Sequence, residues 1–321
     1  MSQAIQALAI IGVSLLGIDR LILGCGGIAR KFGVPIFLIG VTIAAILTSL
    51  PELAVSIKAA AAENSSLGIS TAVGANIVNL GLILSVISLI GPAQEAPEGL
   101  EKTAFALLAM TVLFVSLLLD SFLSRIDGLV LVTGSVIVFV WLLRFETSQG
   151  PIVVSYDKEF GSDISIKSSS LNIALGLAAL IAGYLIFDRS AIFDWGRAND
   201  GSINQVVLGV VVFGLITSVP ELLVGIVSVL RKEFNFALGM VIGSSVANIS
   251  IAAGISMALE PVRVPPSMLS FHVFAMVAFV LVFFAMIWDY RGIKKKSLSK
   301  PEGAALLAAY AAFVIYAGNA I

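Results

Sequence analysis

The sequence predicts an all-α polytopic membrane protein with ten transmembrane helices, arranged as two inverted five-helix repeats with broken core helices. The composition is the first observation: 59% of the 321 residues are apolar, 12% are charged, and the mean hydropathy is +1.06. The second is that apolar runs of about 20 residues, the length that crosses a bilayer as a helix, recur along the chain. The third is that two distant stretches match each other at one offset.

The composition also excludes several classes of protein. A soluble domain carries about 25% charged residues, twice the fraction found here. A soluble enzyme, a nucleic-acid-binding domain and a disordered scaffold are therefore excluded. The net charge of −1 implies no polyanionic partner. A single cysteine and a single histidine exclude a disulfide framework and a Cys- or His-based metal site. We expect no nucleic-acid partner and no bound cofactor.

The apolar runs give the order of the elements. The predicted spans cover residues 4–24, 36–61, 68–91, 103–120, 126–143, 170–187, 204–230, 236–258, 267–288 and 303–320. An even number of spans places both termini on one side. Most of the 19 Lys and Arg residues fall in the segments on the other side, and positive charge is retained in the cytoplasm. We therefore expect a multi-pass protein of the cell inner (plasma) membrane with both termini outside.

The longest polar stretch divides the chain into two halves. Residues 144–169 are expected to form a cytoplasmic linker, residues 1–143 an N-terminal five-helix repeat, and residues 170–321 a C-terminal inverted repeat. A shift of 169 residues superposes Thr48–Leu53 (TSLPEL) on Thr217–Leu222 (TSVPEL). The same shift pairs Gly74 with Gly243, Asn79 with Asn248, and Asp19-Arg20 with Asp188-Arg189.

An odd number of spans in each half makes the second copy enter the membrane in the opposite orientation. Inverted repeats of this kind are typical of secondary transporters, which hold their substrate near the midplane, at the interface of the halves. Asp19 and Asp188 are each followed by an arginine near the end of a predicted span. We interpret them as interfacial anchors or local ion pairs.

Two glutamates carry most of the functional argument. Glu52 and Glu221 lie in mid-span, where an ionised side chain costs at least ~2.5 kcal/mol. No lysine or arginine lies in mid-span to pair with them. A cation bound between the two carboxylates removes their repulsion, and protonation does so in its absence. A kinked helix with a buried, protonated glutamate is the structural alternative, which two equivalent copies make less attractive.

Neighbouring residues supply further oxygen atoms. Pro51 and Pro220 each remove a backbone hydrogen bond, which frees carbonyl groups that can line a cavity. Thr48 and Thr217 lie four residues before the glutamates and face the same way on a helix. Further candidate ligands are Ser49, Ser218, Asn79, Asn248 and Ser244. This set of hard oxygen donors suits Ca²⁺ and Na⁺, and disfavours copper and zinc.

At these motifs the sequence resembles the cation/calcium exchanger superfamily, specifically the prokaryotic form of its sodium/calcium exchanger branch. The resembling stretches are Gly40–Leu53, Gly74–Asn79, Gly209–Leu222 and Gly243–Asn248, with a lead-in at Gly17–Asp19 and Ala29–Val34. The resemblance implies a ten-helix fold with outward termini, two tilted helices beside a core of broken helices, and four adjoining cation sites.

The resemblance also implies which residues form these sites. The implied central calcium site consists of Glu52, Glu221, Thr48 and Thr217. The implied sodium site on the cytoplasmic side consists of Thr48, Glu52 and the carbonyl of Ala45. The implied sodium site on the outside consists of Thr217, Glu221, Ser244 and the carbonyl of Gly214. Asn79 and Asn248 would flank the middle position.

The sequence departs from the family pattern at two positions. Ala75 replaces a frequent serine, so we expect the inner sodium site to lack a hydroxyl ligand. Asn248 replaces a frequent aspartate, so the ionised charge of the site is at most −2. One Ca²⁺, two Na⁺ or two protons neutralise that charge. Both departures weaken the family's expected coupling of three Na⁺ to one Ca²⁺.

The sequence therefore predicts a secondary antiporter that exchanges Ca²⁺ for Na⁺ by alternating access, in a lipid bilayer. The first alternative is an exchanger of Ca²⁺ or another divalent cation for H⁺. A cation channel and a non-transporting membrane scaffold are further alternatives. An enzyme is not expected, because no nucleophile–base pair accompanies the carboxylates. A monomer is compatible with the sequence.

Overall fold

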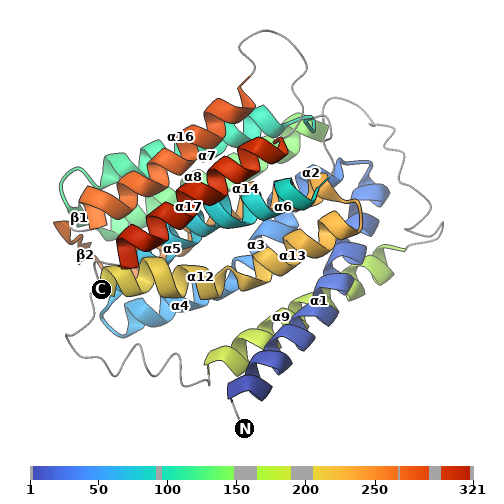
Figure 1. Ribbon diagram of the computed structural model, residues 1–321, viewed down its shortest axis with the longest axis horizontal. Coiled ribbons are helices and arrows are strands. Elements are labelled where there is room, and N and C mark those ends of the chain that lie inside the picture. The colour runs from blue at the N-terminus through green and yellow to red at the C-terminus, as the bar shows by residue number, and fades with distance from the viewer. Residues whose placement is uncertain are drawn as a thin grey trace.

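The computed structural model describes residues 3–91, 96–147, 165–188, 205–266, 268–288 and 298–318, and these residues are almost entirely helical (Figure 1). The exception is a two-stranded antiparallel ribbon, in which β1 (Phe122–Leu123) pairs with β2 (Val262–Arg263). The central part of the predicted linker, residues 148–164, lies outside the described residues.

The helices follow one another in a similar order in the two halves. The first half contains α1 (Gln3–Phe32), α2 (Ile36–Ile39), η1 (Gly40–Ala44), α3 (Ala45–Thr48), α4 (Leu50–Ala61), α5 (Ser65–Ile77), η2 (Val78–Ile83), α6 (Leu84–Ile90), α7 (Leu100–Leu117) and α8 (Arg125–Thr147). The second half contains α9 (Ile166–Asp188), α11 (Gln205–Val207), η3 (Leu208–Phe213), α12 (Gly214–Thr217), α13 (Val219–Leu230), α14 (Phe234–Ala247), η4 (Asn248–Ala252), α15 (Ala253–Leu259), η5 (Met268–Val273), α16 (Phe274–Ile287) and α17 (Lys300–Gly318). The elements labelled η are π-helical turns.

The described residues contain seven helical stretches that are long and apolar enough to cross a membrane. These stretches are Ile36–Ala61, Ser65–Ile90, Leu100–Leu117, Arg125–Arg144, Phe234–Leu259, Met268–Ile287 and Lys300–Gly318. The pair Leu208–Thr217 and Val219–Leu230, bent by 41°, makes an eighth if it is one span. All eight coincide with predicted spans, within a few residues at each end, and the protein is an all-helical membrane protein.

The first predicted span ends too early. We expected it to end at residue 24, but α1 continues to Phe32, through Arg30 and Lys31. These two side chains favour helix and are stabilised by the negative end of the helix dipole, so a change from apolar to basic does not mark the helix end. Gly33 does mark it, because its φ of +64° is a left-handed conformation that glycine adopts without strain.

Both core helices break at the serine of the repeated motif. α3 ends at Thr48 and α4 begins at Leu50, while α12 ends at Thr217 and α13 begins at Val219. Pro51 therefore lies in the first turn of its helix segment, where its missing N–H is not needed. In Figure 1 the broken helix α12–α13 runs beside α3–α4 in the opposite direction.

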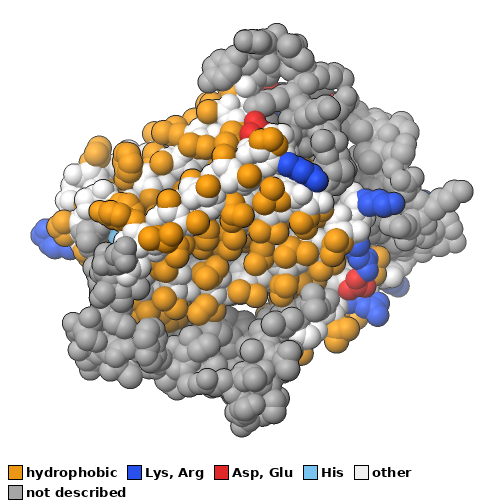
Figure 2. Space-filling model, in the orientation of Figure 1, with side chains coloured by type: hydrophobic (Ala, Val, Ile, Leu, Met, Phe, Trp, Pro, Cys, Tyr) orange, Lys and Arg blue, Asp and Glu red, His pale blue; other side chains and the backbone are white. Residues whose placement is uncertain are grey.

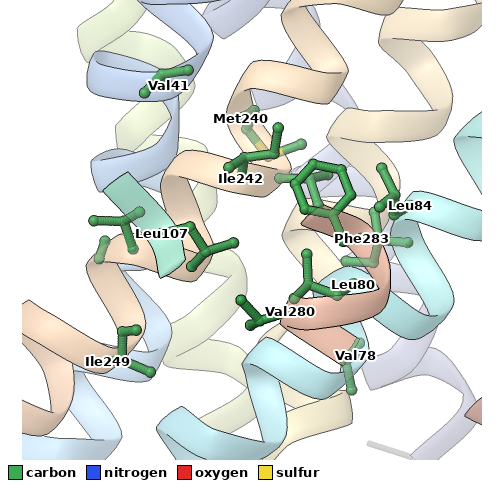
Figure 3. Packing of buried hydrophobic residues seen from close by; sticks show 14 of the residues in the cluster. Val41, Val78, Leu80, Leu84, Leu107, Met240, Ile242, Ile249, Val280 and Phe283 are labelled. Atoms are coloured by element: carbon green, nitrogen blue, oxygen red, sulfur yellow. The ribbon is translucent and has the colours of Figure 1, made fainter. Parts of the chain in front are cut away.

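Two helices fill the centre of the molecule. The span that contains α14 is 94% buried, whereas the span formed by α17 is 28% buried. Gly243 of α14 packs against Val41 and Ala45, and Gly74 of α5 packs against Val210 and Gly214. Each central helix thus crosses the broken helix of the other half at a glycine. Apolar side chains such as Leu80, Met240 and Phe283 fill the neighbouring space (Figure 3).

The outer face is apolar, as a lipid-facing surface must be. Figure 2 shows hydrophobic side chains over the face formed by α16 and α17, with Lys and Arg near the ends of the helices. Large apolar residues are widely exposed there, among them Phe274 and Ile315 at 69% and 66%. In water such a surface would aggregate, so these exposures are consistent with a lipid surrounding.

α1 and α9 form a close pair at the side of the molecule (Figure 1). Gly17 of α1 faces Gly176 and Ala179 of α9, which lets the two backbones approach. Asp19 forms an ion pair with Arg231, which follows α13, so the ion pair is not a local one with the neighbouring Arg20. Because α1 extends to residue 32, Asp19 lies within the helix, where a partner on another helix can reach it. The side chains of Asp188 and Arg189 lie outside the described residues.

The crossing glycines give a test of the fold. A Cβ on Gly74 would overlap the backbone of Val210, so Gly74→Ala should lower the free energy of unfolding by about 1–3 kcal/mol. Gly243→Ala should do the same, because its Cβ would overlap the carbonyl of Val41. Thermal unfolding in detergent measures the effect. Gly12→Ala is the control, since nothing lies within 4 Å of its added Cβ. Wild-type stability in both variants would contradict the close crossing.

Candidate cation site

The broken helices bring the two glutamates of the repeat to the centre of the protein. Glu52 lies in the first turn of α4 and Glu221 in the first turn of α13, and both side chains are fully buried. They are the only Asp, Glu, Lys or Arg side chains that are buried in the described part of the chain. The carboxylates are close enough to interact electrostatically. The positive end of each helix dipole partly compensates its carboxylate.

Each glutamate faces hydroxyl groups of the opposite half. Ser218 Oγ donates a hydrogen bond of 3.3 Å to Glu52 Oε1, and Thr217 also faces this carboxylate. In the equivalent arrangement Glu221 faces Thr48 and Ser49. Thus the carboxylate of one half sits beside the helix break of the other half. The threonine and the glutamate of one motif, four residues apart, lie on separate helix segments, because the helix is broken between them.

A cluster of three oxygens lies beside Glu221. The hydroxyls of Thr48 and Ser244 are 3.1 Å apart and hydrogen-bonded. Both hydroxyl oxygens lie 3.3 Å from the carbonyl oxygen of Ala45. Because each hydroxyl has one proton, one hydroxyl donates to this carbonyl while the other donates to the first hydroxyl. We call Thr48 Oγ1, Ser244 Oγ and Ala45 O the Ser244 cluster.

This cluster corrects the grouping that the resemblance suggested. Ser244 lies with Thr48 and Ala45, whereas we had placed it with Thr217 and Gly214. The reason is the crossing of the halves, which packs α14 against α3 and packs α5 against α12. By the same geometry Ala75 lies against Gly214, so the missing hydroxyl belongs to the opposite cluster from the one we expected.

The two asparagines are buried without hydrogen-bond partners among the described residues. This holds for both amide atoms of Asn79 and both amide atoms of Asn248. Asn79 lies in the π-helical turn η2 and Asn248 begins the equivalent turn η4. A buried polar group that makes no hydrogen bond costs about 1–3 kcal/mol, and a bound cation could complete the two Oδ1 atoms, which are acceptors.

The carboxylates leave further atoms without partners. In the described part of the chain, Glu52 Oε2, both oxygens of Glu221, and Ser49 Oγ make no hydrogen bond. All are acceptors or hydroxyls, and none faces a buried cationic side chain. Among the described residues, no three His, Cys, Asp or Glu side chains are grouped so that they could hold a metal ion. The arrangement therefore fits a small hard cation held by mixed oxygen ligands.

Sequence reasoning identified the oxygen donors but missed their pairing across the halves. The signal was present in the inverted repeat, because equivalent helices that run antiparallel at one level bring the start of one motif beside the end of the other. The π-helical turns at Gly40–Ala44, Leu208–Phe213, Val78–Ile83 and Asn248–Ala252 were also missed. Such turns are rare and short, and no residue pattern in the sequence marked them.

The chain is similar to proteins of one transporter family. The family model described as sodium/calcium exchanger protein matches residues 3–145 and 197–318. The inner membrane protein YrbG of Escherichia coli is 29% identical, over 88% of each chain. The sodium/calcium exchanger MaX1 of Methanosarcina acetivorans is 29% identical, over 93% of each chain. The structure of the sodium-calcium exchanger NCX_Mj superposes with a TM-score of 0.77, at 27% identity over 96% of each chain.

A bound cation should stabilise the folded protein. Adding Ca²⁺ at about 100 times its dissociation constant should raise the free energy of unfolding by about 2.7 kcal/mol and raise the Tm in detergent. Glu221→Gln should remove most of this rise, because both carboxylate oxygens of Glu221 lack a hydrogen-bond partner and are candidate ligands of the cation. Glu101→Gln, at an exposed position in the first turn of α7, should keep it. An equal Ca²⁺-dependent rise in both variants would show that the cation binds elsewhere.

Proposed function

The chain belongs to the sodium/calcium exchanger protein family, and we propose that it is a secondary antiporter that exchanges Ca²⁺ for Na⁺ by alternating access. The family is one of transporters, so the protein is a multi-pass membrane cation/calcium exchanger. The observation that supports the choice of cations is the pair of buried carboxylates whose free oxygens are surrounded by neutral oxygen donors.

The proposed architecture has ten spans in two inverted repeats. Residues 1–143 and 170–321 are the repeats, and residues 144–169 are a cytoplasmic linker. α1 and α9 supply the two spans beyond the eight apolar stretches described above. The antiparallel course of the two broken helices in Figure 1 supports the inversion. The basic residues favour external termini in the cell inner membrane, where YrbG also resides by its name.

The proposed site binds cations through residues of both halves. Its candidate ligands are Glu52, Glu221, Thr48, Thr217, Ser49, Ser218, Asn79, Asn248 and Ser244, with the carbonyls of Ala45 and Gly214. One Ca²⁺ between the carboxylates neutralises their charge of −2, and two Na⁺ do the same. Calcium and sodium therefore compete for the same pair of glutamates, and the site holds one load or the other.

This charge balance explains why transport is an exchange. Two uncompensated carboxylates in a membrane interior are costly, because the low dielectric strengthens their repulsion and no water solvates them. The loaded, neutral site is enclosed at a lower cost. The protein therefore changes its access between the two sides when it carries Ca²⁺ or Na⁺, and rarely when it is empty. Transport of one cation in one direction then requires return with the other.

A second candidate is exchange of Ca²⁺ for H⁺ on the same residues. It is favoured by Ala75 and Asn248, which give the site fewer sodium ligands and no third carboxylate. Two protons on Glu52 and Glu221 would also neutralise the site. Imposing Na⁺ and pH gradients separately on proteoliposomes distinguishes the two. Calcium uptake driven by a pH gradient without Na⁺ would establish proton coupling.

Removal of either carboxylate tests the proposed function. Glu52→Gln and Glu221→Gln each lower the charge of the site to −1, so Ca²⁺ would leave it with an excess positive charge. Sodium-driven ⁴⁵Ca²⁺ uptake into proteoliposomes should fall by at least 100-fold in both variants. Glu302→Gln is the control, because Glu302 lies in the first turn of α17 and accepts hydrogen bonds from Ser299, and this variant should transport at the wild-type rate. Wild-type uptake by the Glu52 and Glu221 variants would overturn the proposal.

A further inference from the structure

The two halves of the site are matched at every polar position except one. The shift of 169 residues pairs Thr48 with Thr217, Ser49 with Ser218, Glu52 with Glu221, and Asn79 with Asn248. It pairs Ser244 with Ala75. The structure places these last two residues in equivalent surroundings, since Ser244 contacts Ala45 and Ala75 lies against Gly214. The asymmetry of the site is therefore a single hydroxyl group.

The hydroxyl of Ser244 changes the hydrogen bonds that the neighbouring threonine makes. In the Ser244 cluster, Thr48 shares hydrogen bonds with Ser244 and the carbonyl of Ala45. On the other side, Thr217 Oγ1 donates to the carbonyl of Phe213 at 2.8 Å, within its own helix. Its distance to the carbonyl of Gly214 is 3.5 Å. The fully buried methyl group of Ala75 supplies no oxygen there.

A cation without its water shell needs several oxygens around it, because each missing ligand leaves part of its hydration energy unreplaced. The Ser244 cluster offers three oxygens beside Glu221, whereas the equivalent positions on the Thr217 side offer two, the hydroxyl of Thr217 and the carbonyl of Gly214. A preformed three-oxygen binding site for a sodium ion therefore exists, among the described residues, only on the side of the Ser244 cluster. A second sodium ion can lie between the carboxylates, which both have free oxygens.

The charge of the site independently indicates a load of two sodium ions. Glu52 and Glu221 carry −2, the asparagines are neutral, and no other Asp, Glu, Lys or Arg side chain is buried in the described residues. Two Na⁺ balance this charge. A third would leave one uncompensated positive charge inside the membrane, which is unfavourable. Ligand count and charge count both limit the load to two sodium ions.

We propose that Ala75 limits this exchanger to two Na⁺ per Ca²⁺, so that one transport cycle moves no net charge. This inference rests on the proposed exchange of Ca²⁺ for Na⁺. Ala75 acts as a specificity-determining residue through the hydroxyl that it lacks. The neutral amide of Asn248 acts in the same direction by withholding a third negative charge.

The test measures the Ca²⁺ gradient that a fixed Na⁺ gradient supports at equilibrium in proteoliposomes. A tenfold Na⁺ gradient should support a 100-fold Ca²⁺ gradient, and a membrane potential imposed with K⁺ and valinomycin should leave it unchanged. A ratio of three would instead give a 1,000-fold gradient at zero potential, with strong voltage dependence. That result would overturn the inference while leaving sodium-coupled exchange intact. Failure of Na⁺ to drive any uptake would overturn the proposed function itself.

Two variants test the assignment to Ala75. Ala75→Ser restores the missing hydroxyl and should lower the Na⁺ concentration that half-inhibits Ca²⁺ uptake by several-fold. Ala75→Ser combined with Asn248→Asp also supplies the third negative charge and should shift the equilibrium gradient toward 1,000-fold, with voltage dependence. Ala104→Ser, at a buried alanine of α7 that contributes none of the candidate ligands, is the matched control and should behave as wild type. Wild-type Na⁺ dependence and ratio in both Ala75 variants would overturn the assignment.

Discussion

The central constraint on this protein is the free-energy cost of holding two carboxylates close together in a membrane interior. Glu52 and Glu221 are fully buried, interact with one another, and have no cationic side chain beside them in the described residues. The protein can relieve this cost by binding a cation or by protonation. One Ca²⁺ and two Na⁺ each neutralise the charge of −2. Because the empty site is unfavourable and either load neutralises it, the same constraint favours exchange of one load for the other.

The helix breaks and the close helix crossings position these two carboxylates. The breaks at Ser49 and Ser218 end one helix and begin another at membrane depth, which places each glutamate at a helix N-terminus. The glycine crossings of α5 and α14 bring each central helix close to the opposite broken helix. Neutral oxygen donors then surround the glutamates from both halves. Substitutions at Gly74 and Gly243 are therefore expected to disturb the site as well as the packing.

Much of this organisation could be predicted from the sequence, because strong physical signals encode it. Apolar length identified the membrane-spanning helical stretches, and the matched motifs identified the glutamates and the hydroxyl groups that face them. The end of α1 was missed because Arg30 and Lys31 favour helix as well as water. The grouping of Ser244 with Thr48 was missed because it depends on how the two halves cross, and this contact joins residues 196 positions apart. Spacing within one helix cannot report such a contact.

Equilibrium binding of ⁴⁵Ca²⁺ to the purified protein tests most directly whether the carboxylate pair is the shared site of both cations. One Ca²⁺ should bind per chain, Na⁺ should displace it completely with a Hill coefficient near two, and the double variant Glu52→Gln with Glu221→Gln should bind none. Calcium binding that persists at saturating Na⁺, or that survives in the double variant, would contradict the account.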